Sequence, residues 1–154
     1  MKFSTNEDIE APIEEVFAAV SNLEFYERAA IRRGAEVTRT SAHETPQPGM
    51  TWKVRFIYRN RQREMRVELV ELDPPQSMSF ESQSGGLQTM LDIELVALAK
   101  SRTRLSVGLE LRPLNLPARL LVQSLKLAKG NLQKRFKKRV ADFALELGQR
   151  QARA

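Results

Sequence analysis

Residues 117–147 read PARLLVQSLKLAKGNLQKRFKKRVADFALEL, and the rest of the chain is best interpreted around this stretch. Its apolar residues recur at steps of three and four, which places them on one stripe of a helix: Leu121, Leu125, Ala128, Leu132, Phe136, Val140, Phe143 and Leu147. Pro117 stands in the first turn, where a helix tolerates proline. A helix of about 30 residues is roughly 45 Å long. The pattern therefore predicts one long helix that crosses the whole fold.

Positive charge is concentrated in the same part of the chain. Of 25 Lys and Arg residues, ten follow Leu116, together with only two of the 19 Asp and Glu residues. The whole formal net charge of +6 therefore belongs to the C-terminal region. Its densest run consists of Lys134, Arg135, Lys137, Lys138 and Arg139. Such a run can contact phosphates or an anionic membrane, but the helical stripe continues through it, so a solvated helix face is the favoured interpretation.

Before residue 117 the apolar pattern indicates strands and two short helices. Residues 2–10 are predicted as a strand, residues 11–22 and 24–33 as helices, and the second helix is expected to turn Phe25, Ala29 and Ile31 inward. Alternation of apolar and polar residues then predicts strands at 35–42, 51–60, 64–72, 77–83, 88–99 and 104–112. One sheet face is apolar and the other charged, as in an antiparallel sheet with one face in water. The chain is expected to form one domain over residues 1–154.

A curved sheet around one helix encloses more space than a single layer of side chains fills, and such a space is a natural ligand cavity. The predicted lining comes from the apolar faces of the strands and the helix: Trp52, Val54, Phe56, Tyr58, Met65, Val67, Met78, Phe80, Leu91, Ile93, Val107, Leu109, Leu121 and Leu125. Plain core packing is the alternative for each of them. Trp52 and Tyr58 each carry a hydrogen-bonding group that could orient a polar ligand end. For a buried Trp52, a bond from the indole to a backbone carbonyl is favoured.

Composition excludes several kinds of chemistry. The chain has no cysteine, which excludes disulfides, thiolate catalysis and cysteine–zinc sites, and fits a reducing, cytoplasmic location. The N-terminal residues are polar and acidic, unlike a secretory signal. No zinc-finger spacing, P-loop or dinucleotide fingerprint is present, so neither a cofactor nor a nucleic acid partner is expected.

No residue is predicted as catalytic. His43 is the single histidine and the one side chain that titrates near neutrality unperturbed, but it lies in a loop rich in proline and glycine and is expected to be exposed. Asp92 and Glu94 share the outer face of a strand. They are expected to pair across strands with Arg104 or Arg66 rather than to act as acid and base.

In this order, the segments IEAPIEEVFAAVSN (9–22), ELDPP (71–75) and SGGLQTMLDIELVAL (84–98) and the amphipathic C-terminal helix resemble the START-like superfamily. Its broad bacterial branch is called polyketide cyclase/dehydrase or SRPBCC. The resemblance covers essentially the whole chain, and the order of the segments carries it, because each motif alone is loose. It implies an α+β helix-grip fold. In this fold a curved antiparallel sheet of about seven strands wraps around a long C-terminal helix that closes a deep apolar cavity.

The same resemblance implies binding of lipids, polyketides, sterols or other hydrophobic small molecules, for transport or sequestration. It does not imply catalysis, since the superfamily mixes carriers, cyclases, chaperone-activator domains and oxygenase subunits. A cyclase/dehydrase-type enzyme that acts mainly by orienting its substrate, with a proton relay through Tyr58 or His43, is the second hypothesis. The third is an adaptor that docks an acidic partner, or transiently an anionic membrane, through the basic helix.

Overall fold

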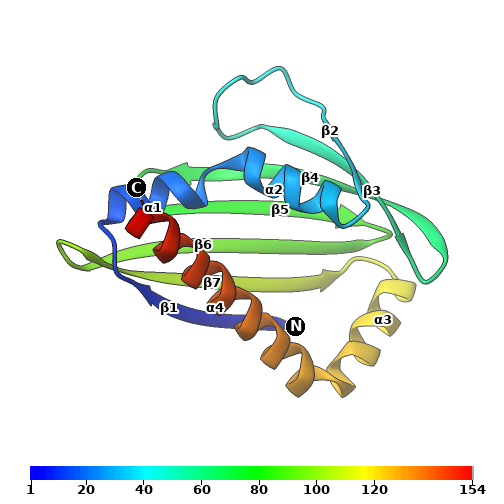
Figure 1. The fold of residues 1–154 in the computed structure, drawn as a ribbon. Helices are drawn as coiled ribbons and strands as arrows, with labels where there is room; N and C mark the ends of the chain where they lie inside the picture. The colour runs from blue at the N-terminus through cyan, green and yellow to red at the C-terminus, as the bar shows by residue number, and fades with distance from the viewer. Residues whose placement is uncertain (154) are drawn as a thin grey trace.

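The computed structural model describes the backbone of residues 1–153 and the side chains of residues 1–149. Seven strands form one antiparallel sheet in the order β1-β7-β6-β5-β4-β3-β2 (Figure 1). In chain order the elements are β1 (Lys2–Ile9), α1 (Ile13–Val20), α2 (Leu23–Arg32), β2 (Glu36–Arg39), β3 (Thr51–Tyr58), β4 (Arg61–Asp73), β5 (Ser77–Ser84), β6 (Leu87–Ala99), β7 (Arg102–Pro113), α3 (Leu116–Leu127) and α4 (Lys129–Arg153). The predicted α+β helix-grip fold is confirmed.

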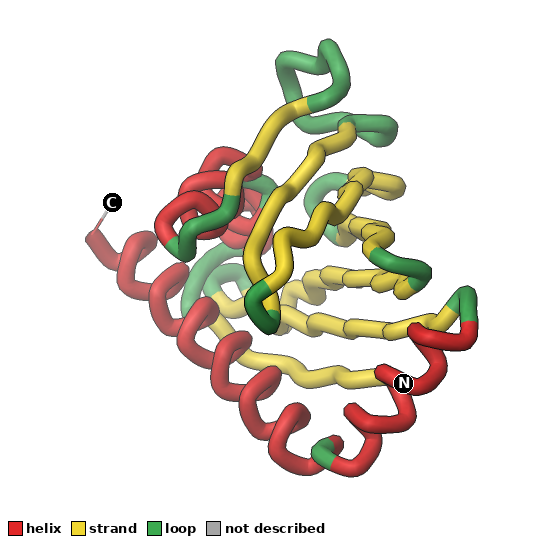
Figure 2. The backbone as a smooth tube through the Cα atoms, turned by 90° about the vertical axis from the view of Figure 1, so that its right-hand side faces the viewer, coloured by secondary structure: helices red, strands yellow, loops and turns green. Residues whose placement is uncertain are grey.

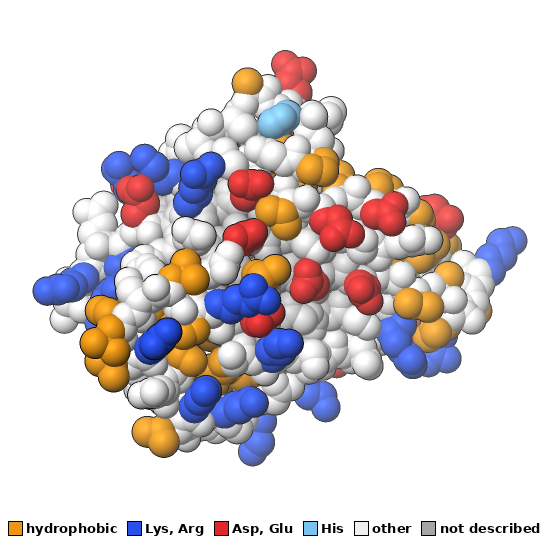
Figure 3. All heavy atoms as spheres, turned by 180° about the vertical axis from the view of Figure 1, so that it is seen from behind, with side chains coloured by type: hydrophobic (Ala, Val, Ile, Leu, Met, Phe, Trp, Pro, Cys, Tyr) orange, Lys and Arg blue, Asp and Glu red, His pale blue; other side chains and the backbone are white. Residues whose placement is uncertain are grey.

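The sheet is curved, and α1, α2 and α4 lie on its concave side (Figure 2). The strands alternate as predicted, so the inner face carries buried apolar side chains such as Leu69, Met78 and Leu105. The outer face carries many charged side chains (Figure 3). No helix in the described part of the chain is long and apolar enough to cross a membrane.

The prediction of one uninterrupted helix over residues 117–147 is wrong. The helix breaks at Ala128, whose N–H bonds to the carbonyl of Leu125, three residues back, and α3 and α4 meet at a sharp bend (Figure 1). Gly130, a poor helix former, lies just after the break. Periodicity could not reveal it, because the steps from Leu125 to Ala128 and on to Leu132 keep the apolar stripe in phase. A stripe identifies an apolar face but does not show that the helix axis is continuous.

The two helices pack differently. The stripe of α4 lies against β1 and α1: Val140, Ala144 and Leu147 are buried, and the ring of Phe136 lies 6.0 Å from that of Phe3. Helix α3 packs mainly on β7, through Ala118 and Val122. Of its leucines, Leu121 and Leu125 are half-buried, whereas Leu116, Leu120 and Leu127 are exposed.

Strand β4 contains a bulge at Val70, between Leu69 and Glu71. Leu69 pairs with Phe80 and Leu72 with Met78, although strict alternation would send Leu69 and Leu72 to opposite faces. The extra residue restores the inward direction for Leu72. A bulge also increases the local twist of a strand, which fits the curvature of this sheet.

The turn between β5 and β6 is joined to the start of α3. Gly85 and Gly86 both have left-handed backbone, with φ of 56° and 80°. The carbonyl of Gly86 accepts a 2.7 Å bond from the N–H of Leu114, and Asn115 Oδ1 accepts a 2.9 Å bond from the N–H of Ala118, which caps α3. A Cβ on Gly86 would lie 2.0 Å from Asn115 Nδ2, whereas a Cβ on Gly85 would meet nothing within 4 Å.

We therefore expect Gly86→Ala to destabilise the protein more than Gly85→Ala. Each substitution forces a non-glycine residue into the left-handed region, at a cost of about 1–2 kcal/mol. Gly86→Ala should also displace the Asn115 cap, which adds about 1 kcal/mol. Urea unfolding of the two variants measures the difference. In an Asn115→Gly background the difference should shrink, and a difference that persists there would show that Asn115 is not its cause.

Candidate functional site

A cavity of about 410 Å³ lies between α2 and the concave face of the sheet. Its wall is mostly apolar, and the polar side chains in it are Tyr26, Glu27, Ser82 and Thr89, with the indole N–H of Trp52. The lining residues are Leu23, Tyr26, Glu27, Ala30, Val37, Trp52, Val54, Met65, Val67, Phe80, Ser82, Thr89, Leu91, Ile93 and Leu109. Helix α2 and six strands, β2 to β7, thus build the wall.

The structure brings eight of the fourteen predicted lining residues to this wall: Trp52, Val54, Met65, Val67, Phe80, Leu91, Ile93 and Leu109. Their contact with a ligand stays a prediction. Met78 and Val107 are instead buried in the core, deeper along the same face. Phe56 and Tyr58 lie beyond the cavity, toward the β3–β4 hairpin, and the side chain of Tyr58 stacks with Arg59 and Arg63.

Leu121 and Leu125 lie on α3, outside the cavity, and no described side chain of α3 or α4 is among its lining residues. The prediction that the C-terminal helix forms the cavity wall is therefore wrong in detail, because the helix turns away at Ala128. Helix α4 supports the cavity indirectly. Its Phe143 ring lies 6.2 Å from the ring of Tyr26 and 6.0 Å from that of Phe25, so α4 packs against α2, which forms the helical wall.

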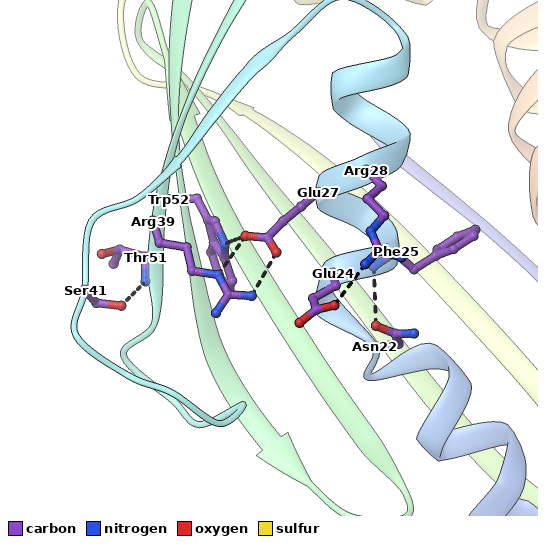
Figure 4. Close-up of polar contacts among 9 residues, drawn as sticks. All are labelled: Asn22, Glu24, Phe25, Glu27, Arg28, Arg39, Ser41, Thr51 and Trp52. Atoms are coloured by element: carbon purple, nitrogen blue, oxygen red, sulfur yellow. Dashed lines mark hydrogen bonds and ion pairs between the residues drawn. The ribbon is translucent and has the colours of Figure 1, made fainter.

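Sequence reasoning missed the α2 residues of the lining. Leu23, Tyr26, Glu27 and Ala30 follow one another at steps of three, one and three, which is one face of a helix. The charge of Glu27 interrupts this stripe, and the inward face of the helix was predicted at Phe25, Ala29 and Ile31 instead. That assignment is wrong for Ile31, which is 55% exposed. Asn22 starts the helix by accepting a 3.3 Å bond from the N–H of Phe25 (Figure 4).

Glu27 joins α2 to the edge of the sheet (Figure 4). Its carboxylate accepts two 2.8 Å bonds from the guanidinium of Arg39 on β2 and one 3.0 Å bond from Nε1 of Trp52 on β3. We call these three residues the Glu27 cluster. The expected bond from Trp52 to a backbone carbonyl is thus wrong, since a side-chain carboxylate on another element takes that place.

The electrostatics of the Glu27 cluster favour the ionised carboxylate. The hydrogen bond from Arg39 lowers the pKa of Glu27, burial opposes this, and the bond from Trp52 lowers it further. The side chains of Glu27 and Arg39 are only 19% and 35% exposed, so water screens their attraction in part. Glu27 and Arg39 cancel each other's charge at the rim of the cavity.

Tyr26 and two other aromatic side chains make up much of the wall. The ring of Phe80 lies 6.4 Å from those of Tyr26 and Trp52. The hydroxyl of Tyr26 donates to the carbonyl of Val20, at the end of α1, and burial raises the pKa of Tyr26. This hydroxyl therefore stays protonated and is already engaged within the protein.

The other residues considered for chemistry lie outside the cavity lining. His43, in the loop between β2 and β3, is half-buried rather than exposed, and its Nδ1 has no hydrogen-bond partner in the described part of the chain. Asp92 and Glu94 lie on the outer face as predicted. Their expected pairing with Arg104 is wrong, because Arg104 pairs with Asp8 at 2.9 Å. Asp92 accepts a 2.7 Å bond from Ser79 instead.

The basic run on α4 is exposed. Lys134, Arg135, Lys137 and Arg139 point to solvent, and Lys138 pairs with Asp142 at 3.1 Å. None of the five cations lines the cavity. A contact of this run with a membrane stays a prediction.

Comparison with known proteins identifies relatives of this chain. Residues 1–148 match the sequence model of a family described as polyketide cyclase / dehydrase and lipid transport. Among curated proteins, none matches the chain in sequence.

Solved structures share the fold. A protein of Thermus thermophilus has a TM-score of 0.65 at 16% identity, covering 96% of this chain and 97% of its own. The Zhui aromatase/cyclase of a Streptomyces species has a TM-score of 0.62 at 12% identity, covering 94% and 93%. A START superfamily protein of Mycobacterium smegmatis has a TM-score of 0.56 at 14% identity, covering 89% and 97%. At such identities the likeness shows the fold alone.

We expect Glu27→Gln to destabilise the protein by about 1–2 kcal/mol, because it removes the charge that Arg39 and Trp52 donate to. Urea unfolding measures the loss. Glu24→Gln is the matched control on the same helix: Glu24 pairs with Arg28 at 3.4 Å, both side chains are about two-thirds exposed, and an exposed pair contributes less than about 1 kcal/mol. Equal losses in the two variants would contradict a special role for the Glu27 cluster.

The stability of the parent protein and that of Glu27→Gln should depend differently on pH. Because the pKa of Glu27 in the folded protein lies below its ordinary value of 4.5, its contribution is complete above that pH and is lost as pH falls through the folded pKa. The stability difference between the parent and Glu27→Gln should therefore be largest near neutral pH and shrink in acid. A difference that stays constant from neutral pH to about pH 3 would contradict the lowered pKa.

Proposed function

The chain belongs to the polyketide cyclase / dehydrase and lipid transport family, and on this premise we propose that it binds a hydrophobic small molecule in the cavity under α2. The observation that carries the proposal is the cavity itself, about 410 Å³ of space with an almost wholly apolar wall. Cavities of this size and lining are typical of small-molecule sites. Transport or sequestration of the molecule is the role that such a site serves.

The driving force for binding would be removal of apolar surface from water. A ligand that buries roughly 200 Å² of apolar surface gains about 5 kcal/mol, from which the cost of association must be subtracted. Rings and branched side chains such as Phe80, Leu91 and Val67 can complement the shape of a ligand, but they make few directional contacts with it. This composition favours a class of apolar ligands over one strictly defined molecule.

Binding is favoured over catalysis by the state of the titratable groups in the lining. These are Tyr26 and Glu27, and both are engaged in hydrogen bonds within the protein. The relay residues of the cyclase hypothesis, Tyr58 and His43, are not among the lining residues. A cyclase-type reaction driven by orientation alone is the alternative, and the fold that the chain shares with the Zhui aromatase/cyclase is compatible with it.

Titration with the neutral, environment-sensitive dye prodan tests the proposal. Trp52 is the single tryptophan and lines the cavity, so bound dye should quench its fluorescence by energy transfer. We expect saturable binding of one dye per chain. Ala30→Phe places a ring in the cavity and should weaken binding at least about tenfold, because overpacking a formed space is unfavourable.

Ile31→Phe is the matched control, since it adds a ring to the next residue of the same helix, where the side chain is exposed. It should leave the affinity within about twofold of the parent. Absence of saturable binding in the parent, or equal affinity of parent and Ala30→Phe, would refute the assignment of this cavity as the binding site.

A further inference from the structure

The polar groups that the sheet contributes to the cavity, from Trp52, Ser82 and Thr89, lie on one row across it. Neighbouring strands pair Trp52 with Val67, Val67 with Ser82, and Ser82 with Thr89, so these four side chains cross β3 to β6 side by side. The next inward row is wholly apolar. It runs from Leu69 through Phe80 and Leu91 to Leu109.

Within the polar row, Ser82 and Thr89 are directly opposite each other on β5 and β6, and both line the cavity. Side chains in such positions are about 4.5–5.5 Å apart at Cβ. Two hydroxyls at this spacing can both donate a hydrogen bond to one ligand oxygen that enters from the cavity and lies between them.

Neither hydroxyl has a hydrogen-bond partner among the described residues. The other three serines of β5 are all engaged: Ser77 bonds to Glu71, Ser79 to Asp92, and Ser84 to the carbonyl of Glu64. Ser82 is thus the one serine of this strand whose donor and acceptor capacity is directed into the cavity and unused by the protein.

An unused hydroxyl in an apolar wall is unfavourable unless water or a ligand bonds to it. A ligand that presents an oxygen to both hydroxyls would recover these bonds, whereas a purely apolar ligand would strip their water and leave them unpaired. Alanine and valine would fill the same positions without this penalty. The pair therefore discriminates between ligands.

We propose that Ser82 and Thr89 form a polar subsite that binds a hydroxyl or carbonyl oxygen of an otherwise apolar, uncharged ligand. The inference rests on the proposed function and specifies its ligand class. Aliphatic or aromatic alcohols, ketones and esters fit this description.

Charge in the lining is the reason that the ligand is uncharged. Glu27 is the one charged residue in the described lining, and Arg39 neutralises it through two 2.8 Å bonds. No lysine or arginine is among those lining residues. A carboxylate seated at Ser82 and Thr89 would be taken out of water without a cation to pair with, which is strongly unfavourable.

Two molecules of the same shape test the subsite: 2-acetylnaphthalene, which has a carbonyl oxygen, and 2-isopropenylnaphthalene, which has a methylene group in its place. Their affinities are measured by displacement of prodan. The parent should bind the ketone about three- to tenfold more tightly than the alkene, the range expected for one or two neutral hydrogen bonds. In a Ser82→Ala/Thr89→Val variant this ratio should fall to near one, with the alkene bound at least as tightly as by the parent, because the unpaired hydroxyls are gone.

Ser79→Ala is the control, because Ser79 is on the same strand but its hydroxyl bonds to Asp92 on the outer face. It should keep the parent's ratio, and thermal unfolding should confirm that all variants are folded. A ratio unchanged in the double variant, with both molecules still bound, would overturn the subsite and leave the proposed function standing. Failure of the parent to bind prodan and both naphthalenes would overturn the proposed function and the subsite together.

Discussion

The cavity depends on the hydrogen bonds that the carboxylate of Glu27 accepts from Arg39 and Trp52. A helix that packs freely on an apolar sheet would settle until the space between them is filled. Here α2 is held at one side by the bonds from Glu27 to Arg39 and Trp52. At its other side the rings of Phe25 and Tyr26 pack on Phe143 of α4. Held between the edge of the sheet and α4, the helix spans the concave face without filling it.

The sheet could be predicted well from sequence because strand alternation has a local cause. Each strand shows its inward face through residues two apart. The break between α3 and α4 had only a weak local signal, Gly130 just after it, because a single glycine is tolerated inside a helix. Ala128 continues the stripe, and only the backbone shows that its N–H bonds three residues back. Where the helix axis turns is decided by packing against β1 and β7, which is non-local.

The candidate site was predictable on the strands and missed on α2. Residues such as Trp52, Met65 and Leu91 face inward by alternation alone, so their place in the wall followed from sequence. The sequence does not reveal the role of Glu27, because its partners are on other elements, 12 and 25 residues away along the chain. The sequence does not indicate a role for Ser82 and Thr89 either, because it does not show that the two residues lie opposite each other on paired strands.

The bulge at Val70 also affects how this chain can be compared with its relatives. On the two sides of Val70 the inward positions of β4 differ in parity, from the odd-numbered Val67 and Leu69 to the even-numbered Leu72. An alignment that runs without a gap through β4, against a protein lacking the bulge, would match inward residues to outward ones on one side of that point. At identities of 12–16% nothing in the residues themselves would reveal the error. Any transfer of cavity positions between such proteins therefore has to be made on superposed strands.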